Sequence, residues 1–338
     1  MKKNYLFLFL FILFASSAFS QISKVHYIPP VTSNSGSIAD QYIYLSTPSE
    51  ADVDYDIQII GGGTISGTFN NTSPFTYYIG DGNSTQLTVN SNLSASVLNN
   101  RGYIITASCP IYVSVRYNAG FQGGAFTSKG TAGLGTHFRT AMMPMGDRTT
   151  AVQQNDFLSY VSIMATEDNT IIKASFPNAN GSSNLLNIGG VGGLPLRVDL
   201  MKGESYIFAV EASTSNVESN RFALFGALIQ SVDEDAIEDP TKPIAVTVGS
   251  SNGTFAQSSN GRDQGVDQIV PVEKVGHEYI FVRTAGNNDF ENVILVADKN
   301  NTEIYLNDQT TVYETLNAGD FVIIEGDKYS ATGIGANM

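Results

Sequence analysis

The chain has 338 residues, and its 32 acidic side chains outnumber its 18 lysines and arginines, which gives a formal net charge of −14 at pH 7. This balance argues against nucleic acid or anionic lipid as a partner, because phosphate binding needs clustered basic side chains. A single cysteine, Cys109, excludes an intramolecular disulfide, so stability must come from a buried β-sheet core.

The N-terminus has the pattern of a secretory signal peptide over residues 1–20. Lys2 and Lys3 precede an apolar stretch at 5–14, and the small residues near position 20 suit cleavage before Gln21. The apolar stretch is shorter than the roughly 20 residues that span a bilayer. We therefore expect a secreted or cell-surface protein with no membrane insertion after signal cleavage.

After the signal segment, short stretches rich in Val, Ile, Tyr and Phe alternate with Gly, Asn, Asp and Ser. Helical periodicity is hard to find beyond the signal segment. The chain is predicted to be all-β, with tandem antiparallel β-sandwich-like domains. The clearest strand candidates lie at residues 42–46, 57–60, 112–117, 279–283, 292–296 and 320–325.

Parts of the chain recur at a period of roughly 130 residues, the size of a tandem β-domain. Each copy has an apolar strand, a turn with Asn and Thr, and a second strand. The matching segments are 163–172 with 295–304, 200–204 with 316–320, 101–104 with 225–228, and 109–113 with 242–246.

This recurrence predicts three β units, at residues 33–122, 130–260 and 265–338. Glycine-rich stretches separate them. The third unit stops before any equivalent of the 243–246 strand, and a missing strand leaves ladder groups unpaired. We therefore expect this last unit to be incomplete and the natural protein to continue past Met338.

Two local features carry structural expectations of their own. Asn and Asp tolerate left-handed backbone, so the turns at 167–169 and 298–301 are expected to close hairpins between adjacent strands. Cys109 lies between Ser108 and Pro110 at the start of a strand, and we expect a buried, inert thiol there.

Five segments share their sequence pattern with a known family, namely 135–139 (GTHFR), 160–170 (YVSIMATEDNT), 243–246 (PIAV), 267–272 (DQIVPV) and 276–280 (GHEYI). Together they resemble the IgGFc-binding protein N-terminal domain family, in the version found in large secreted Bacteroidetes proteins. The resemblance implies a secreted or surface binding protein without catalytic residues. In that group a gliding-motility-associated C-terminal sorting domain and type IX secretion are common, which this resemblance implies here too.

The strongest candidate for specific chemistry is the acidic run at residues 233–239. Asp233, Asp235, Glu238 and Asp239 could bind calcium, since a hard cation with oxygen ligands relieves carboxylate repulsion. The spacing does not follow an EF-hand loop, and the alternative is a solvated acidic loop between two strands. No other cofactor is expected.

Enzyme motifs do not point to catalysis. Residues 249–253 fit the G-x-S-x-G pattern after an apolar strand, but the polar, Gly-rich residues that follow cannot form the helix of a nucleophile elbow. His26, His137 and His277 are scattered, without a second His or Cys at metal-ligand spacing. We expect a non-catalytic protein.

Three functions are compatible with these observations. The first is an adhesin-like protein that presents the loops of its β-domains to a glycoprotein, a polysaccharide or a cell surface. The second is a structural spacer, and the third is a carbohydrate-active accessory module, which the absence of Trp disfavours. The sequence leaves the ligand open.

Overall fold

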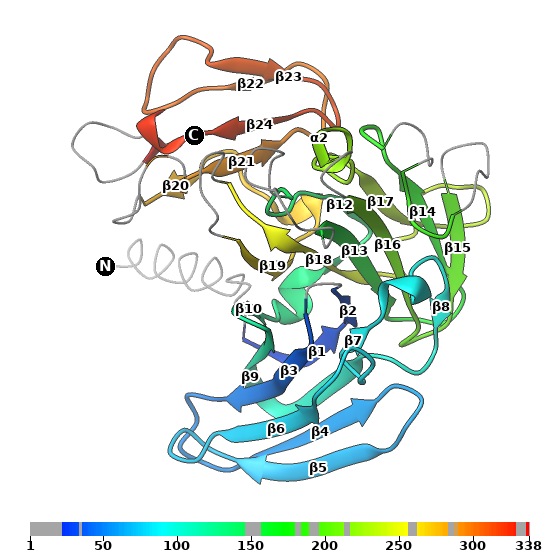
Figure 1. Ribbon diagram of the computed structural model, residues 1–338. Helices are drawn as coiled ribbons and strands as arrows, with labels where there is room; N and C mark the ends of the chain where they lie inside the picture. The colour runs from blue at the N-terminus through cyan, green and yellow to red at the C-terminus, as the bar shows by residue number, and fades with distance from the viewer. Residues whose placement is uncertain are drawn as a thin grey trace, which may run out of the picture.

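The computed structural model describes residues 22–33, 36–145, 157–179, 184–188, 196–212, 217–255, 262–282, 288, 290–328 and 336–337. The chain is all-β and its larger sheets are antiparallel, which confirms the predicted fold class (Figure 1). The predicted signal peptide lies outside the described residues. Within the described ranges no helix is long and apolar enough to cross a membrane.

The first sheet is organised around one long strand, β9 (Tyr103–Ala119). Its N-terminal half pairs with β1 and β4, and its C-terminal half pairs with β3 and β10. Both halves turn their apolar side chains into one core cluster. The other described strands of this sheet are β1 (Ser23–Ile28), β3 (Ile38–Ser46), β4 (Val53–Ile59), β5 (Thr64–Phe69), β6 (Phe75–Gly80) and β10 (Gln122–Thr127).

The second unit repeats this pairing, with the long strand divided between two sheets. In one sheet β13 pairs with β16 and β18, and β18 also pairs with β19. In the first sheet the corresponding strand β3 pairs with β6 and β9, and β9 also pairs with β10. The described strands of this sheet are β8 (Val97–Leu98), β11 (Leu134–Gly135), β13 (Phe157–Ala165), β16 (Ser205–Ala212), β18 (Ile244–Gly253) and β19 (Asp263–Gln268).

The other sheet of the second unit follows the same plan. There β14 pairs with β15 and β17, and β17 also pairs with β12. In the first sheet the corresponding strand β4 pairs with β5 and β9, and β9 also pairs with β1. The recurrence found in the sequence is therefore a recurrence of strand pairing. The described strands here are β12 (His137–Arg139), β14 (Thr170–Ser175), β15 (Leu196–Leu200) and β17 (Leu228–Val232).

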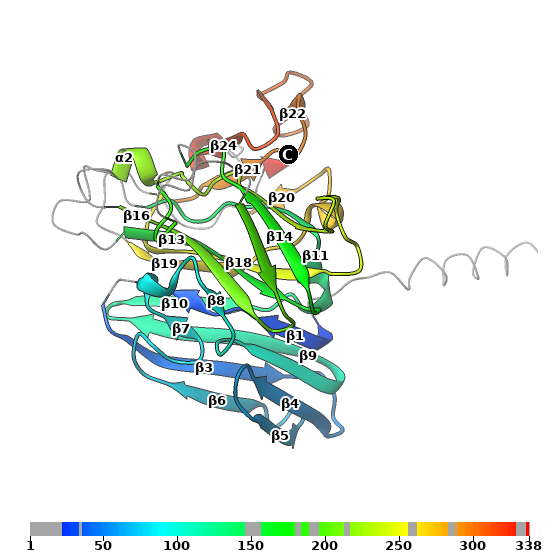
Figure 2. The same cartoon turned by 90° about the vertical axis from the view of Figure 1, so that its right-hand side faces the viewer.

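The third unit contains the same first four strands. β21 pairs with β24, and β22 with β23, as β13 pairs with β16, and β14 with β15. Figures 1 and 2 show this unit stacked on the second, which in turn stacks on the first. The strands are β20 (Ile280–Phe281), β21 (Val293–Val296), β22 (Thr302–Ile304), β23 (Glu314–Leu316), β24 (Phe321–Ile324) and β25 (Ala336–Asn337).

Small elements complete the described chain. β2 and β7 form a short parallel pair, and the helical segments are single turns. These elements are β2 (Val31–Thr32), β7 (Thr88–Val89), α2 (Val217–Asn220) and the 3-10 turns Ser91–Leu93, Gly130–Gly133, Val272–Lys274 and Gly326–Lys328.

The expected hairpins at 167–169 and 298–301 are wrong, because each turn joins strands of two different sheets. Asn169 and Asn301 do have left-handed backbone, with φ of 56° and 58°. Thr170 and Thr302 donate their hydroxyls to the carbonyl oxygens of residues three positions earlier, at 2.7 and 2.8 Å. The same turn chemistry serves either connection, so local residues could not show which strands would pair.

The prediction of a buried Cys109 is also wrong, since this side chain is exposed. Ser108, Cys109 and Pro110 are three consecutive exposed residues in the middle of β9. Here β9 passes from one half of the sheet to the other, and the inward and outward alternation of a regular strand is lost.

Cys109 should therefore react with a maleimide reagent under native conditions at a rate close to that of the unfolded chain. Mass spectrometry of the labelled protein would measure both rates, and Cys109→Ser provides the unlabelled control. A thiol that reacts only after denaturant is added would contradict the exposed position of Cys109.

The first two units share a continuous core. Leu158, Tyr160, Ile207 and Ala209 of the second unit belong to the core cluster of the first, and both faces of β13 are buried. Two strand pairs cross the predicted unit boundaries. β10 pairs with β9 across the boundary at 122, and β19 pairs with β18 across the boundary between 260 and 265. The division into three units at the predicted bounds stays a prediction.

A buried polar network ties the two units together. The Nε2 atom of His26 lies 3.0 to 3.1 Å from the carbonyl oxygens of Ser23 and Ile111, so Nε2 carries the proton, because a carbonyl only accepts. Ser128 lies 3.1 Å from Nδ1, and Gln268 donates to the Tyr27 carbonyl. Burial lowers the pKa of His26, although the two carbonyl contacts oppose this.

Candidate functional site

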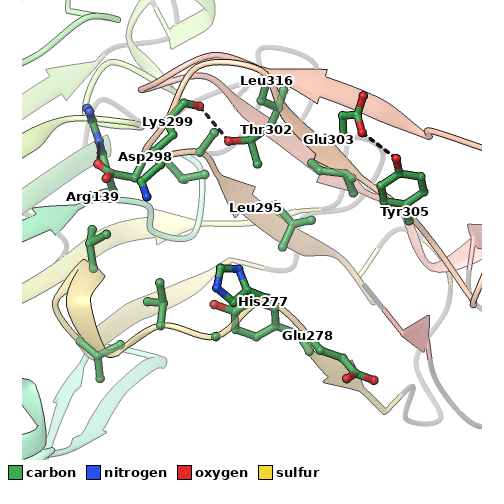
Figure 3. A pocket seen from close by; sticks show the side chains of 18 of the residues that line it. Arg139, His277, Glu278, Leu295, Asp298, Lys299, Thr302, Glu303, Tyr305 and Leu316 are labelled. Carbon is green, nitrogen blue, oxygen red and sulfur yellow. Dashed lines mark hydrogen bonds and ion pairs between the residues drawn. The ribbon is translucent and has the colours of Figure 1, made fainter.

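A cleft of about 760 Å³ lies between residues 270–279 and the strands β21 and β22 (Figure 3). Its lining includes the apolar side chains of Leu295, Ile304 and Leu316. On the rim, the Tyr305 hydroxyl donates to Glu303 at 2.6 Å, and this hydrogen bond raises the pKa of Tyr305. The cleft thus combines an aliphatic interior with a polar rim.

Beside this cleft the strand pairing of the third unit differs from that of the second. In the second unit β17 lies between β12 and β14 and pairs with both. In the third unit the counterpart of β14 is β22, and among the described residues it pairs only with β23. Ile304 and Leu316 belong to the hydrophobic cluster of the third unit and Leu295 packs against it, so the aliphatic lining of the cleft is part of the packing of this unit.

Asp298 anchors the third unit to the second at one side of this cleft. It accepts hydrogen bonds from His137 Nε2 at 2.7 Å and from Arg139 Nε at 2.9 Å, and Figure 3 shows it beside Arg139. Burial raises the pKa of Asp298, but the hydrogen bonds from Arg139 and His137 outweigh burial, and its pKa lies below the usual value. The Arg139 guanidinium also donates to the Gly226 carbonyl. These residues form a structural joint.

Apolar contacts complete the joint. The ring of Phe321 on β24 lies 5.2 Å from that of Phe222 and 4.9 Å from that of Phe225. Gly226 and Gly319 approach so closely that a Cβ atom on Gly226 would overlap the Gly319 carbonyl. The joint was not predictable from the sequence, since its residues lie about 90 to 160 positions apart along the chain.

The predicted calcium ligands lie in the loop between β17 and β18. The Asp233 carboxylate accepts a hydrogen bond from the Ile237 amide. The Asp239 carboxylate accepts hydrogen bonds from the Thr241 hydroxyl and amide, and these two bonds lower the pKa of Asp239. Glu238 accepts from Thr136, and Asp235 is exposed. In the described part of the chain no three His, Cys, Asp or Glu side chains are placed to hold a metal ion. The calcium site stays a prediction.

The G-x-S-x-G segment lies within the long buried strand β18. Ser250 and Ser251 are 1 and 0% exposed. A nucleophile elbow requires an exposed serine at a strand-to-helix turn, so this segment has a different geometry.

The outer face of the first sheet carries a group of neighbouring tyrosines, Tyr42 and Tyr44 on β3, Tyr78 on β6 and Tyr112 on β9, which we call the tyrosine face. The Tyr42 ring centroid lies 5.1 Å from that of Tyr78 and 5.9 Å from that of Tyr44. Tyr44, Tyr78 and Tyr112 are 37, 49 and 38% exposed. Alternation along β3 and β9 directs these rings outward, while Ile43 and Val113 fill the core.

Charged side chains lie at both ends of the tyrosine face and in its middle. At one end, a hydrogen bond from Tyr78 to Asp81 raises the pKa of Tyr78 to about 12. In the middle, the exposed Arg116 is the register partner of Tyr42. At the other end, a groove of about 670 Å³ runs past Tyr44 and Arg116 to Lys129 and Asp267, which form an ion pair at 2.8 Å.

The tyrosine face was not singled out from the sequence. The alternation Tyr42, Ile43, Tyr44 marks a strand with an aromatic outer face. The partner strands that bring Tyr78 and Arg116 beside it were not determined by that pattern.

Comparison with known proteins gives one family. The family model described as IgGFc binding protein matches residues 124–333, more than half of the chain. No curated protein and no solved structure matches the chain. The matched segment contains the second unit and the joint, whereas the tyrosine face precedes it. By this match, the chain belongs to the IgGFc binding protein family.

Proposed function

We propose that the protein is a non-catalytic, adhesin-like binding protein, which holds a glycoprotein or a polysaccharide through its tyrosine face. The cluster of partly exposed rings on β3, β6 and β9 is the observation that carries this proposal. Tyrosine gives a large contact area with few torsions to immobilise, and its hydroxyl can bond to a polar ligand.

The scaffold supports binding by this face. Each tyrosine projects from a paired strand whose opposite side is packed in the core, so the rings are held in place before a ligand arrives. A preorganised surface loses less conformational entropy on binding. The signal-like residues 1–20 support export to the cell surface or medium, and the resemblance to secreted Bacteroidetes proteins supports a type IX route.

A spacer role is the second candidate. The joint of Asp298 with His137 and Arg139, and the shared core of the first two units, would give a stiff row of domains. A spacer needs no aromatic surface, so it leaves the tyrosine face unexplained.

The double variant Tyr44→Ala with Tyr78→Ala should bind immobilised mucin-type glycoprotein or polysaccharide at least about tenfold more weakly than the unchanged chain, because exposed aromatic anchors carry much of a binding energy. Surface plasmon resonance with the whole chain would measure this, with and without calcium.

Tyr313→Ala is the matched control, since Tyr313 is 39% exposed but lies in the third unit. Its binding should equal that of the unchanged chain. If the unchanged chain binds and the double variant binds equally well, the tyrosine face is not the contact surface. If the unchanged chain binds nothing, the spacer reading replaces this proposal.

A further inference from the structure

We propose that the ligand of the tyrosine face is a sugar chain that carries carboxylate groups, with sugar rings stacked on Tyr42, Tyr44 and Tyr78 and a carboxylate held by Arg116. This inference rests on the proposed function, and it names the ligand class of the same site.

The ring arrangement suits stacking of a chain of sugars. Tyr42 and Tyr44 are two residues apart on β3, which places their Cα atoms roughly 6.8 Å apart on one face, and Tyr78 lies directly across the sheet from Tyr42. The face of an aromatic ring is electron-rich and attracts the polarised C–H groups of a sugar. Successive rings along and across β3 therefore offer successive platforms.

Several of the side chains around the rings carry hydroxyl groups. Ser46 and Thr76 are exposed, and the hydroxyls of Ser114 and Thr127 lie 3.1 Å apart beside the groove. A protein partner would need a desolvated apolar centre for its anchor residues. Tyrosines set among hydroxyls match a ligand that is itself rich in hydroxyls.

Arg116 supplies the charge preference. It makes no ion pair with any described residue, whereas Lys129, Arg139 and Arg197 are each paired with a carboxylate. A guanidinium presents parallel donors that fit a carboxylate. Two nearby carboxylates oppose an acidic ligand, Asp81 at Tyr78 and Asp267 in the groove, and Lys129 is paired with Asp267. Salt screens the more distant part of the net charge of −14 beyond about 8 Å at physiological ionic strength.

The test compares a polyuronic acid with the same polymer after its carboxyls are reduced to alcohols. The whole unchanged chain should bind the acid form about tenfold more tightly, and this preference should shrink as salt is added. Arg116→Gln should lose the preference but keep the affinity for the reduced polymer, and Arg116→Lys should fall between them.

Arg197→Gln is the control, since Arg197 is an exposed arginine of the second unit, and it should keep the full preference. Thermal midpoints should be the same for all these variants. Equal affinity of the unchanged chain for the two polymers would overturn the role of Arg116. Binding that survives enzymatic removal of glycans from a mucin-type glycoprotein would overturn the sugar ligand, while the proposed binding function would stand.

Discussion

Gly226→Ala is expected to lower the free energy of unfolding by about 2–5 kcal/mol. Gly226 has a φ of 68°, a conformation that costs an L-residue about 1–2 kcal/mol. Its new Cβ would also overlap the Gly319 carbonyl, and such overpacking typically adds about 1–3 kcal/mol. Because neither clashing group is a flexible side chain, the third unit must shift away from the second. Urea unfolding would measure the loss.

Gly120→Ala is the matched control for this change. Gly120 has a similar φ of 63° in the turn between β9 and β10, but a Cβ there meets no atom within 4 Å. It should lose only the conformational part, about 1–2 kcal/mol. Equal losses for the two variants would mean that Gly226 and Gly319 do not pack against each other in solution.

Gly124→Ala should destabilise the protein by about 1–3 kcal/mol, through the contact between the first two units. Gly124 on β10 is the register partner of Tyr117 on β9, and a Cβ would lie less than 3.0 Å from the Tyr117 ring. Tyr117 and Tyr160 are 1% exposed and share the same core cluster, so the displaced ring has no free space to enter. Burial raises the pKa of both hydroxyls.

The neighbouring Gly123 gives the comparison. Its Cβ would meet only the Asn118 side chain, at 3.8 Å, and its backbone is not left-handed. Gly123→Ala should therefore be neutral or stabilising by about 0.4–1 kcal/mol, because alanine restricts the unfolded chain. Thermal unfolding of both variants would decide the point, and a Gly124→Ala midpoint as high as that of Gly123→Ala would refute the close packing over Tyr117.

Local chemistry made much of the fold predictable. The all-β class follows from short alternating stretches, and the repeat follows from turns in which Asn169 and Asn301 adopt the same backbone. The strand with which each strand beside these turns would pair was not predictable, because the same turn can close a hairpin or connect two sheets. The exposure of Cys109 depends on a local loss of alternation in β9, which composition does not reveal.

The tyrosine face was less predictable than the fold class, because it depends on the register in which strands pair. Tyr42 and Tyr44 are visible as an alternating pair, but Tyr78 joins them through pairing of β3 with β6, and Arg116 through pairing of β3 with β9. The Asp298 joint links residues 159 and 161 positions apart. Contacts at such separations are set by the tertiary fold, which the local pattern does not encode.

Hydroxyl-radical footprinting tests most directly whether the tyrosine face is the binding surface. The whole chain would be oxidised with and without a saturating polyuronic acid, and the modified tyrosines read by mass spectrometry. We predict protection of Tyr44 and Tyr78, with Tyr313 and the cleft residue Tyr305 unchanged. Protection of Tyr305 with Tyr44 and Tyr78 still reactive would contradict the account and move the site to the cleft.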